Sequence, residues 1–88
     1  MRIDVLLHRL CLTRSRSEAQ AACQTGAVTL DQRLARPSDL VAEGARVCIR
    51  YPSRLLELEL VALPVKGTSK ASAREMYAIL RDEKREPE

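Results

Sequence analysis

Aromatic side chains are nearly absent from this chain of 88 residues, which contains no phenylalanine or tryptophan and only two tyrosines, Tyr51 and Tyr77. Proteins that bind single-stranded nucleic acid commonly stack successive bases on several aromatic side chains. Two tyrosines cannot build such a platform. If the chain binds nucleic acid, we expect it to contact the phosphates and the shape of folded or double-helical RNA.

Long hydrophobic segments are absent as well. Apolar runs such as Leu60–Leu63 are far shorter than the roughly 20 residues that span a bilayer. The N-terminal segment is interrupted by Asp4, His8 and Arg9 and therefore lacks the apolar centre of a secretory signal. With 45% apolar residues, we expect one small folded domain in the cytoplasm.

Metal ligands and catalytic groups are few. The three cysteines form no C-x-x-C pair, and His8 is the only histidine, so no zinc site is indicated. His8 and Cys11 lie three residues apart, but no third orienting group accompanies them as a cysteine nucleophile requires. We expect buried, reduced thiols at Cys11, Cys23 and Cys48, no metal, no cofactor and no enzymatic activity.

Positive charge is concentrated in the first part of the chain. Residues 1–74 carry 12 Lys or Arg against 7 Asp or Glu, whereas residues 75–88 carry 3 against 5. Ten of the 12 cations are arginines, whose forked guanidinium groups match phosphate oxygens in two-point contacts. This distribution favours a polyanionic partner.

The segment Thr13–Gln20 contains the most informative motif. Ser15 and Glu18 have the spacing of a capping box, in which the serine caps a helix and the glutamate lies three residues on. Arg14 and Arg16 flank the cap, where the helix start presents free N–H groups and a partial positive charge. A phosphate is the expected ligand, although a well-capped helix with solvated arginines would show the same pattern.

Periodicity predicts two helices followed by strands. Apolar residues at helical spacing predict a helix over residues 3–11 and a second over 16–25, which Gly26 ends. Alternating residues predict strands at 28–30, 33–34, 46–51 and 55–63, with a tight turn at Asp31-Gln32. Leu40 and Val41 are expected to be buried together.

A final helix is predicted over residues 71–84. Ala73, Met76, Tyr77 and Leu80 have the spacing of one helical face. Ser72 is the expected N-cap, with Glu75 three residues later. The tail from Lys84 to Glu88 is expected to fray.

Several short motifs follow one another along the first half of the chain: Arg2-Ile3-Asp4, Leu7, Ser15-Arg16-x-x-Ala19, Gly26-x-Val28, Pro37-Ser38 and Val41-x-x-Gly44. This ordered set, covering about residues 2–50, resembles the S-four domain, an RNA-binding domain first named in small-subunit ribosomal protein four. The resemblance implies an α+β fold in which two N-terminal helices pack on a small, bent antiparallel sheet, followed by a C-terminal strand and helix. It also implies an RNA surface at the start of the second helix and the loop after the first strand.

The C-terminal motif Lys70-Ala71-x-Ala73-Arg74-x-x-Tyr77 is similar to that of the small heat-shock-induced S-four proteins of bacteria, which associate with ribosomes. This similarity implies binding to ribosomal RNA of the large subunit and a role in recycling stalled subunits during stress. We divide the chain into an S-four core (1–50), a hairpin extension and linker (51–70), and a C-terminal helix and tail (71–88). The family commonly has Asn-Gly where this chain has Asp31-Gln32.

Carrying the family's RNA surface onto this chain gives Arg16 as the first expected phosphate contact, followed by Arg14. The full set of expected RNA-binding residues is Arg2, Arg14, Ser15, Arg16, Gln20, Arg33 and Arg36. Asp4 is expected to be structural, anchoring Arg16 or a backbone amide. This interpretation requires the guanidinium groups to surround one helix entrance without being held in internal carboxylate pairs.

Two other functions remain open. Two short helices joined by a tight turn can resemble a DNA-binding helix-turn-helix. The domain could also be a targeting or interaction module for an RNA-modifying enzyme, because S-four domains occur fused to such enzymes. The sequence does not fix the oligomeric state.

Overall fold

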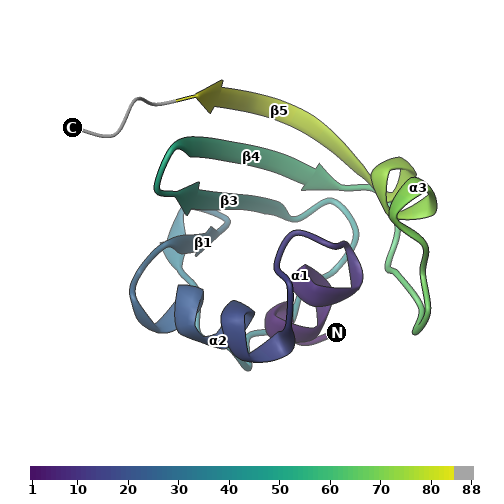
Figure 1. Cartoon of the computed structure of the whole chain (residues 1–88), viewed down its shortest axis with the longest axis horizontal. Coiled ribbons are helices and arrows are strands. Elements are labelled where there is room, and N and C mark those ends of the chain that lie inside the picture. The colour runs from purple at the N-terminus through teal and green to yellow at the C-terminus, as the bar shows by residue number, and fades with distance from the viewer. Residues whose placement is uncertain (85–88) are drawn as a thin grey trace.

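A helix pair and a five-stranded antiparallel sheet dominate the part of the chain that the computed structural model describes, residues 1–84. The strand order is β2-β1-β3-β4-β5, and α1 and α2 lie on one side of the sheet beside β1 and β3 (Figure 1). The predicted α+β class is confirmed. The elements are α1 (Ile3–Arg9), α2 (Arg16–Gln24), β1 (Val28–Leu30), β2 (Arg33–Leu34), β3 (Arg46–Tyr51), β4 (Arg54–Leu60), α3 (Lys70–Ala73), a 3₁₀ turn η1 (Arg74–Met76) and β5 (Tyr77–Lys84).

The two predicted N-terminal helices are present, and small side chains between them allow a close approach. Helix α2 turns Ala19 and Cys23, four residues apart, into the core. Because both side chains are small, the backbones of α1 and α2 can approach closely. Helix α1 supplies the larger groups of the core, at the spacing of one helical face: Ile3, Leu6, Leu7 and Leu10.

Cys11 differs from the sequence prediction, which placed its thiol in the core. The residue follows α1 with a φ of 59° and is exposed, because this left-handed conformation ends the helix and turns the side chain outward. Cys23 is buried, and burial raises the pKa of its thiol. Cys48 is half-buried. All three cysteines are free.

The turn between β1 and β2 forms where it was predicted. Asp31 and Gln32 have φ angles of 49° and 70°, and two consecutive positive values are typical of the turn that best joins antiparallel strands. Asp31 Oδ1 also accepts a hydrogen bond from Arg46 N at 3.0 Å. An aspartate therefore replaces the family's Asn-Gly turn without loss of the hairpin. Gly26, with a φ of 79°, ends α2 as expected.

The core face of the sheet follows the predicted alternation. Val47 and Ile49 of β3 are buried beneath the helices, as are the leucines of β4 at every second position. Strand β4 ends at Leu60, three residues earlier than predicted.

Of Leu40 and Val41, which were predicted to be buried together, only Val41 is buried. Val41 is 3% exposed, whereas Leu40 is 75% exposed. The two side chains point in opposite directions because this segment is extended: Leu40 bridges to Arg2, and Val41 N donates to Met1 O at 2.7 Å.

The predicted long helix over 71–84 is wrong. Helix α3 ends at Ala73, and residues 77–84 form β5, which pairs with β4 along its whole length. The edge of β4 would otherwise leave its backbone groups without partners, so sheet pairing overrides the helical spacing of Ala73, Met76, Tyr77 and Leu80. A bulge at Leu80, opposite Glu57 and Leu58, interrupts the register.

The N-cap of the short helix also differs from the prediction. Ser69, and not Ser72, caps α3, because Ser69 Oγ accepts a hydrogen bond from Ser72 N at 3.1 Å. Of the tail that we expected to fray, Lys84 is the last residue of β5. Residues 85–88 lie outside the described part of the chain.

Tyr51, at the end of β3, ties the sheet to the connection between the helices. Its hydroxyl donates a hydrogen bond to Leu12 O at 2.7 Å. Tyr51→Phe should therefore lower the free energy of unfolding by about 1 kcal/mol, the net contribution of one such bond. Urea denaturation followed by circular dichroism measures this loss, and an unchanged midpoint would show that the bond contributes nothing to stability.

Candidate nucleic-acid interface

A single carboxylate, Asp4, organises the start of both helices. Its side chain is fully buried and accepts hydrogen bonds from two arginines, one glutamine and one backbone amide. The distances are 3.2 Å (Arg2 Nε to Oδ1), 3.1 Å (Arg2 Nη2 to Oδ2), 3.3 Å (Arg16 Nε to Oδ2), 3.0 Å (Gln20 Nε2 to Oδ2) and 2.8 Å (Val5 N to Oδ1). We call Arg2, Asp4, Arg16 and Gln20 the Asp4 cluster.

The local sequence explains why these groups meet. Asp4 lies in the first turn of α1, where a carboxylate interacts favourably with the helix dipole. Arg16 is the first residue of α2 and Gln20 lies four residues later, so both side chains are on the same face of that helix. The small residues between the helices bring this face against the start of α1.

The hydrogen bonds keep Asp4 ionised. Burial by itself would raise the pKa of Asp4, but the hydrogen bonds from Gln20, Arg16, the Val5 amide and Arg2 outweigh it and hold the pKa below its ordinary value of 3.8. The buried carboxylate is therefore negative at neutral pH and fixes the orientation of three side chains around it.

Arg2 and Arg16 are both paired with the Asp4 carboxylate, so the condition set by the sequence analysis, that these guanidinium groups be free of internal carboxylates, is not met. Their side chains nevertheless remain 43% and 50% exposed. Arg16 uses only Nε toward Asp4, and within residues 1–84 no side chain accepts a hydrogen bond from its two Nη atoms. One carboxylate also neutralises only one of the two arginines. The Asp4 cluster therefore keeps a net positive charge, with oriented donors facing solvent.

Ser15 and Arg14 have different positions. Ser15 Oγ accepts a hydrogen bond from Glu18 N at 3.0 Å, so Ser15 is the N-cap of α2, as predicted. Arg14 is exposed and makes no hydrogen bond to Asp4; it lines a hollow together with His8 and Tyr51. Arg14 and Arg16 therefore line two different hollows, which share His8 and Cys11.

Arg33 and Arg36 form a further basic surface near the hairpin. Both are exposed and line a hollow of about 340 Å³ with Asp39. The loop that contains Arg36 runs beside the first turn of α1, because Ile3 N donates to Asp39 O at 2.8 Å. This surface therefore adjoins Arg2, which bridges to Leu40 of the same loop.

Two basic residues beside Arg16 were missed by the sequence analysis. A groove of about 480 Å³ lies between α1 and the loop at residues 66–68, and its walls include Arg9, Arg16 and Lys66. Arg9 lies on the same helix as Asp4, but Lys66 comes from a segment 50 residues after Arg16. Only the fold brings Lys66 to this groove, so no spacing in the sequence could indicate it.

Asp4→Asn should destabilise the protein by about 1–3 kcal/mol at neutral pH, because the neutral amide replaces a charged acceptor of several hydrogen bonds. The contribution of ionised Asp4 is present above its unfolded pKa of 3.8 and is lost as the pH falls through the lower folded value. The difference in unfolding free energy between wild type and variant should therefore shrink in acid. Urea denaturation over a pH series measures it, and a difference independent of pH would contradict the role given to Asp4.

Neither a metal centre nor a transmembrane helix is found in residues 1–84. No three His, Cys, Asp or Glu side chains gather there as ligands. No helix of this region has the length and apolar character needed to cross a bilayer.

Comparison with known proteins shows the family to which the chain belongs. Residues 1–47, more than half of the chain, match the model of the S4 domain, which is the S-four domain named above. The chain is 30% identical over 84 residues to the RQC P-site tRNA stabilizing factor of Halalkalibacterium halodurans, covering 94% of this chain and 93% of that protein.

A solved structure shares the whole fold. Heat Shock Protein 15 of Vibrio cholerae, described as trimeric, superposes with a TM-score of 0.85 at 22% identity, covering 90% of this chain and 80% of that one. The names of the two relatives, a tRNA stabilizing factor and a heat shock protein, agree with the expectation of a non-enzymatic protein. The chain therefore belongs to the S-four family of RNA-binding domains and is related over nearly its whole length to the P-site tRNA stabilizing factor.

Proposed function

We propose that this protein binds structured RNA by gripping phosphates with the Asp4 cluster. The observation that carries the proposal is that one fully buried carboxylate orients Arg2, Arg16 and Gln20 on the same surface. Fixed donors lose less side-chain entropy on binding than free ones do. Guanidinium groups also match the geometry of phosphate oxygens.

Other predicted residues would extend the contact on both sides. Arg33 and Arg36 adjoin Arg2 through the loop beside α1. Arg14 lies beyond the N-cap of α2, where Ser15 holds the helix start in place. Arg9 and Lys66 line the groove next to Arg16. Such a spread of cations suits a folded RNA, whose phosphates are separated across a groove.

The proposed partner is ribosomal RNA or transfer RNA on the large ribosomal subunit, and the proposed setting is the rescue of stalled subunits under stress in the cytoplasm. Support comes from the two relatives, since one is called a P-site tRNA stabilizing factor and the other a heat shock protein. The first of them aligns over nearly the full length of both chains, so the similarity extends beyond the S-four core.

RNA affinity should fall steeply with salt. If about four phosphates are neutralised, the slope of log affinity against log salt concentration should be about −3 to −4. Fluorescence anisotropy with a labelled RNA hairpin measures the slope, and an unlabelled DNA duplex of the same length serves as competitor. A flat salt response would contradict phosphate binding, and stronger competition by DNA would favour a DNA-binding function.

Arg16→Ala should weaken binding of the RNA hairpin about tenfold, because one charged hydrogen bond to phosphate is lost. The melting temperature should fall by only a few degrees, because buried Asp4 loses one hydrogen bond but keeps those from Arg2, Gln20 and the Val5 amide. Co-sedimentation with large ribosomal subunits should decrease in parallel.

Arg50→Ala is the matched control for this experiment. Arg50 is also an exposed arginine, but it lies on β3 next to the buried Ile49 and so points from the opposite face of the sheet. The control removes the same charge and should leave hairpin binding nearly unchanged. Equal losses from both variants would mean that only net charge matters, and the Asp4 cluster would then not be the RNA site.

A further inference from the structure

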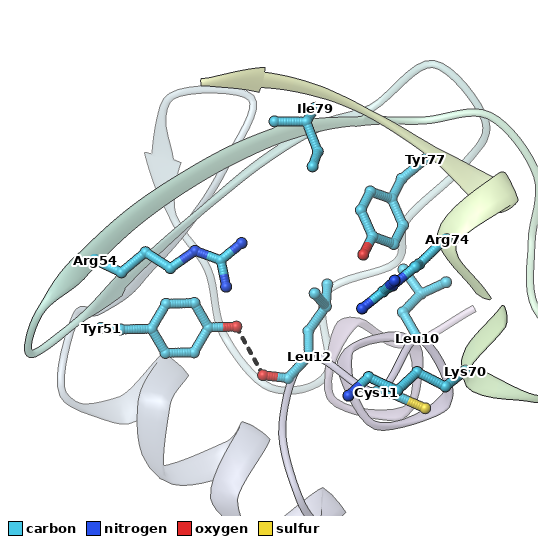
Figure 2. A pocket seen from close by; sticks show the side chains of 9 residues that line it. All are labelled: Leu10, Cys11, Leu12, Tyr51, Arg54, Lys70, Arg74, Tyr77 and Ile79. Atoms are coloured by element: carbon cyan, nitrogen blue, oxygen red, sulfur yellow. Dashed lines mark hydrogen bonds between the residues drawn. The ribbon is translucent and has the colours of Figure 1, made fainter. Parts of the chain in front are cut away.

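A second basic pocket lies between the connection of the two helices and the C-terminal part of the sheet, away from the Asp4 cluster. Its volume is about 490 Å³, within the range of small-molecule sites. Figure 2 shows its nine lining side chains, with the polar ends of Tyr51, Arg54, Arg74 and Tyr77 directed toward the centre. We call it the extension pocket.

The pocket exists because β5 continues the sheet beyond the helix pair. Tyr77 pairs with Leu60 and Ile79 pairs with Leu58, so both side chains face the same side of the sheet as the buried leucines of β4. No helix covers this part of the sheet: Ile79 remains 54% exposed. The uncovered face forms the floor of the pocket, and α3 with η1 forms its rim.

The charge of the extension pocket is positive. Arg54, Lys70 and Arg74 line it, and no aspartate or glutamate does. Arg54 is bound by Asp82, with Nε–Oδ1 and Nη2–Oδ2 distances of 2.7 and 3.0 Å. Within residues 1–84, Lys70 and Arg74 have no carboxylate within ion-pair distance. These two cations are therefore available to an anion.

The chain has two tyrosines and no phenylalanine or tryptophan, and both tyrosines line this pocket. Tyr51 is fixed by its hydrogen bond to Leu12 O, and the Arg54 guanidinium lies 5.9 Å from its ring centroid. Tyr77 and Ile79 provide the apolar floor of the pocket. Cations beside aromatic and apolar surface are the combination that binds a phosphate and its base together.

We propose that the extension pocket binds one unpaired nucleotide of the RNA, with its phosphate at Lys70 and Arg74 and its base against Tyr77 and Ile79. The inference rests on the proposed RNA-binding function and adds a single-stranded contact to it. The pocket also continues toward the S-four core, because Cys11, Leu12 and Tyr51 line both this pocket and the hollow beside Arg14. One RNA strand can therefore reach from Arg14 into the pocket.

Titration with uridine 5′-monophosphate, followed by NMR, tests the proposal. The aromatic signals come only from two tyrosines and one histidine, so a base stacked in the pocket should shift the Tyr77 ring signals upfield. Uridine and inorganic phosphate are the comparison ligands, and neither should reproduce the shift at equal concentration. Absence of a tyrosine shift, or the same response to phosphate alone, would overturn the nucleotide site.

Variants separate this site from the proposed RNA surface. Arg74→Ala should weaken the binding of uridine 5′-monophosphate about tenfold, because one charged hydrogen bond to phosphate is lost, and Lys70→Ala should weaken it in the same direction. Both residues are exposed, so melting temperatures should be unchanged. Arg16→Ala and the control Arg50→Ala should leave mononucleotide binding intact.

Hairpin binding by the same proteins reports on the other proposal. If Arg16→Ala and Arg74→Ala weaken mononucleotide binding equally, the separate pocket is refuted. If the wild type binds the mononucleotide through Arg74 but binds no hairpin, the proposed function fails and the pocket stands.

Discussion

The arrangement of the proposed RNA-binding surface depends on the burial of one negative charge. A carboxylate without solvent contact is tolerated only when hydrogen bonds replace its lost hydration, and Asp4 has five of them within 3.3 Å. Four of the five come from side chains that reach the surface. The requirement that Asp4 be satisfied thus fixes where Arg2, Arg16 and Gln20 point, so that a stability constraint in the protein interior determines the geometry of a binding surface.

This constraint also explains why arginine suits positions 2 and 16. A guanidinium group has five N–H donors in a rigid fork, whereas lysine has one nitrogen at the end of a flexible stem. Arg16 can use Nε toward Asp4 and keep its two Nη atoms for solvent or phosphate. A lysine would have to share a single nitrogen between the two partners. The internal ion pair is therefore compatible with binding, provided that the residue is arginine.

Local signals in the sequence predicted most of the N-terminal half. The Ser15 N-cap, the helix-ending Gly26 and the turn at Asp31-Gln32 depend on residues close in sequence, and they form as expected. The prediction for the C-terminal segment failed for the opposite reason. Strand β5 forms against its own helical spacing because it pairs with the open edge of β4, whose partner residues lie 17 to 30 positions earlier. Exposure of Cys11 depends on one left-handed residue, and the place of Lys66 depends on a loop. The predicted set of seven binding residues was therefore separated into neighbouring surfaces that spacing alone could not distinguish.

The Asp4 cluster and the extension pocket are built from different parts of the chain and can therefore form at different times during synthesis. Every member of the Asp4 cluster lies within the first 20 residues. The strands that pack against the two helices, β1, β3 and β4, are complete at Leu60. The extension pocket has no wall until residues 77–84 have aligned with β4. During synthesis from the N-terminus, the helix pair that we propose to bind phosphate can therefore assemble while the last strand is still inside the ribosome that made it.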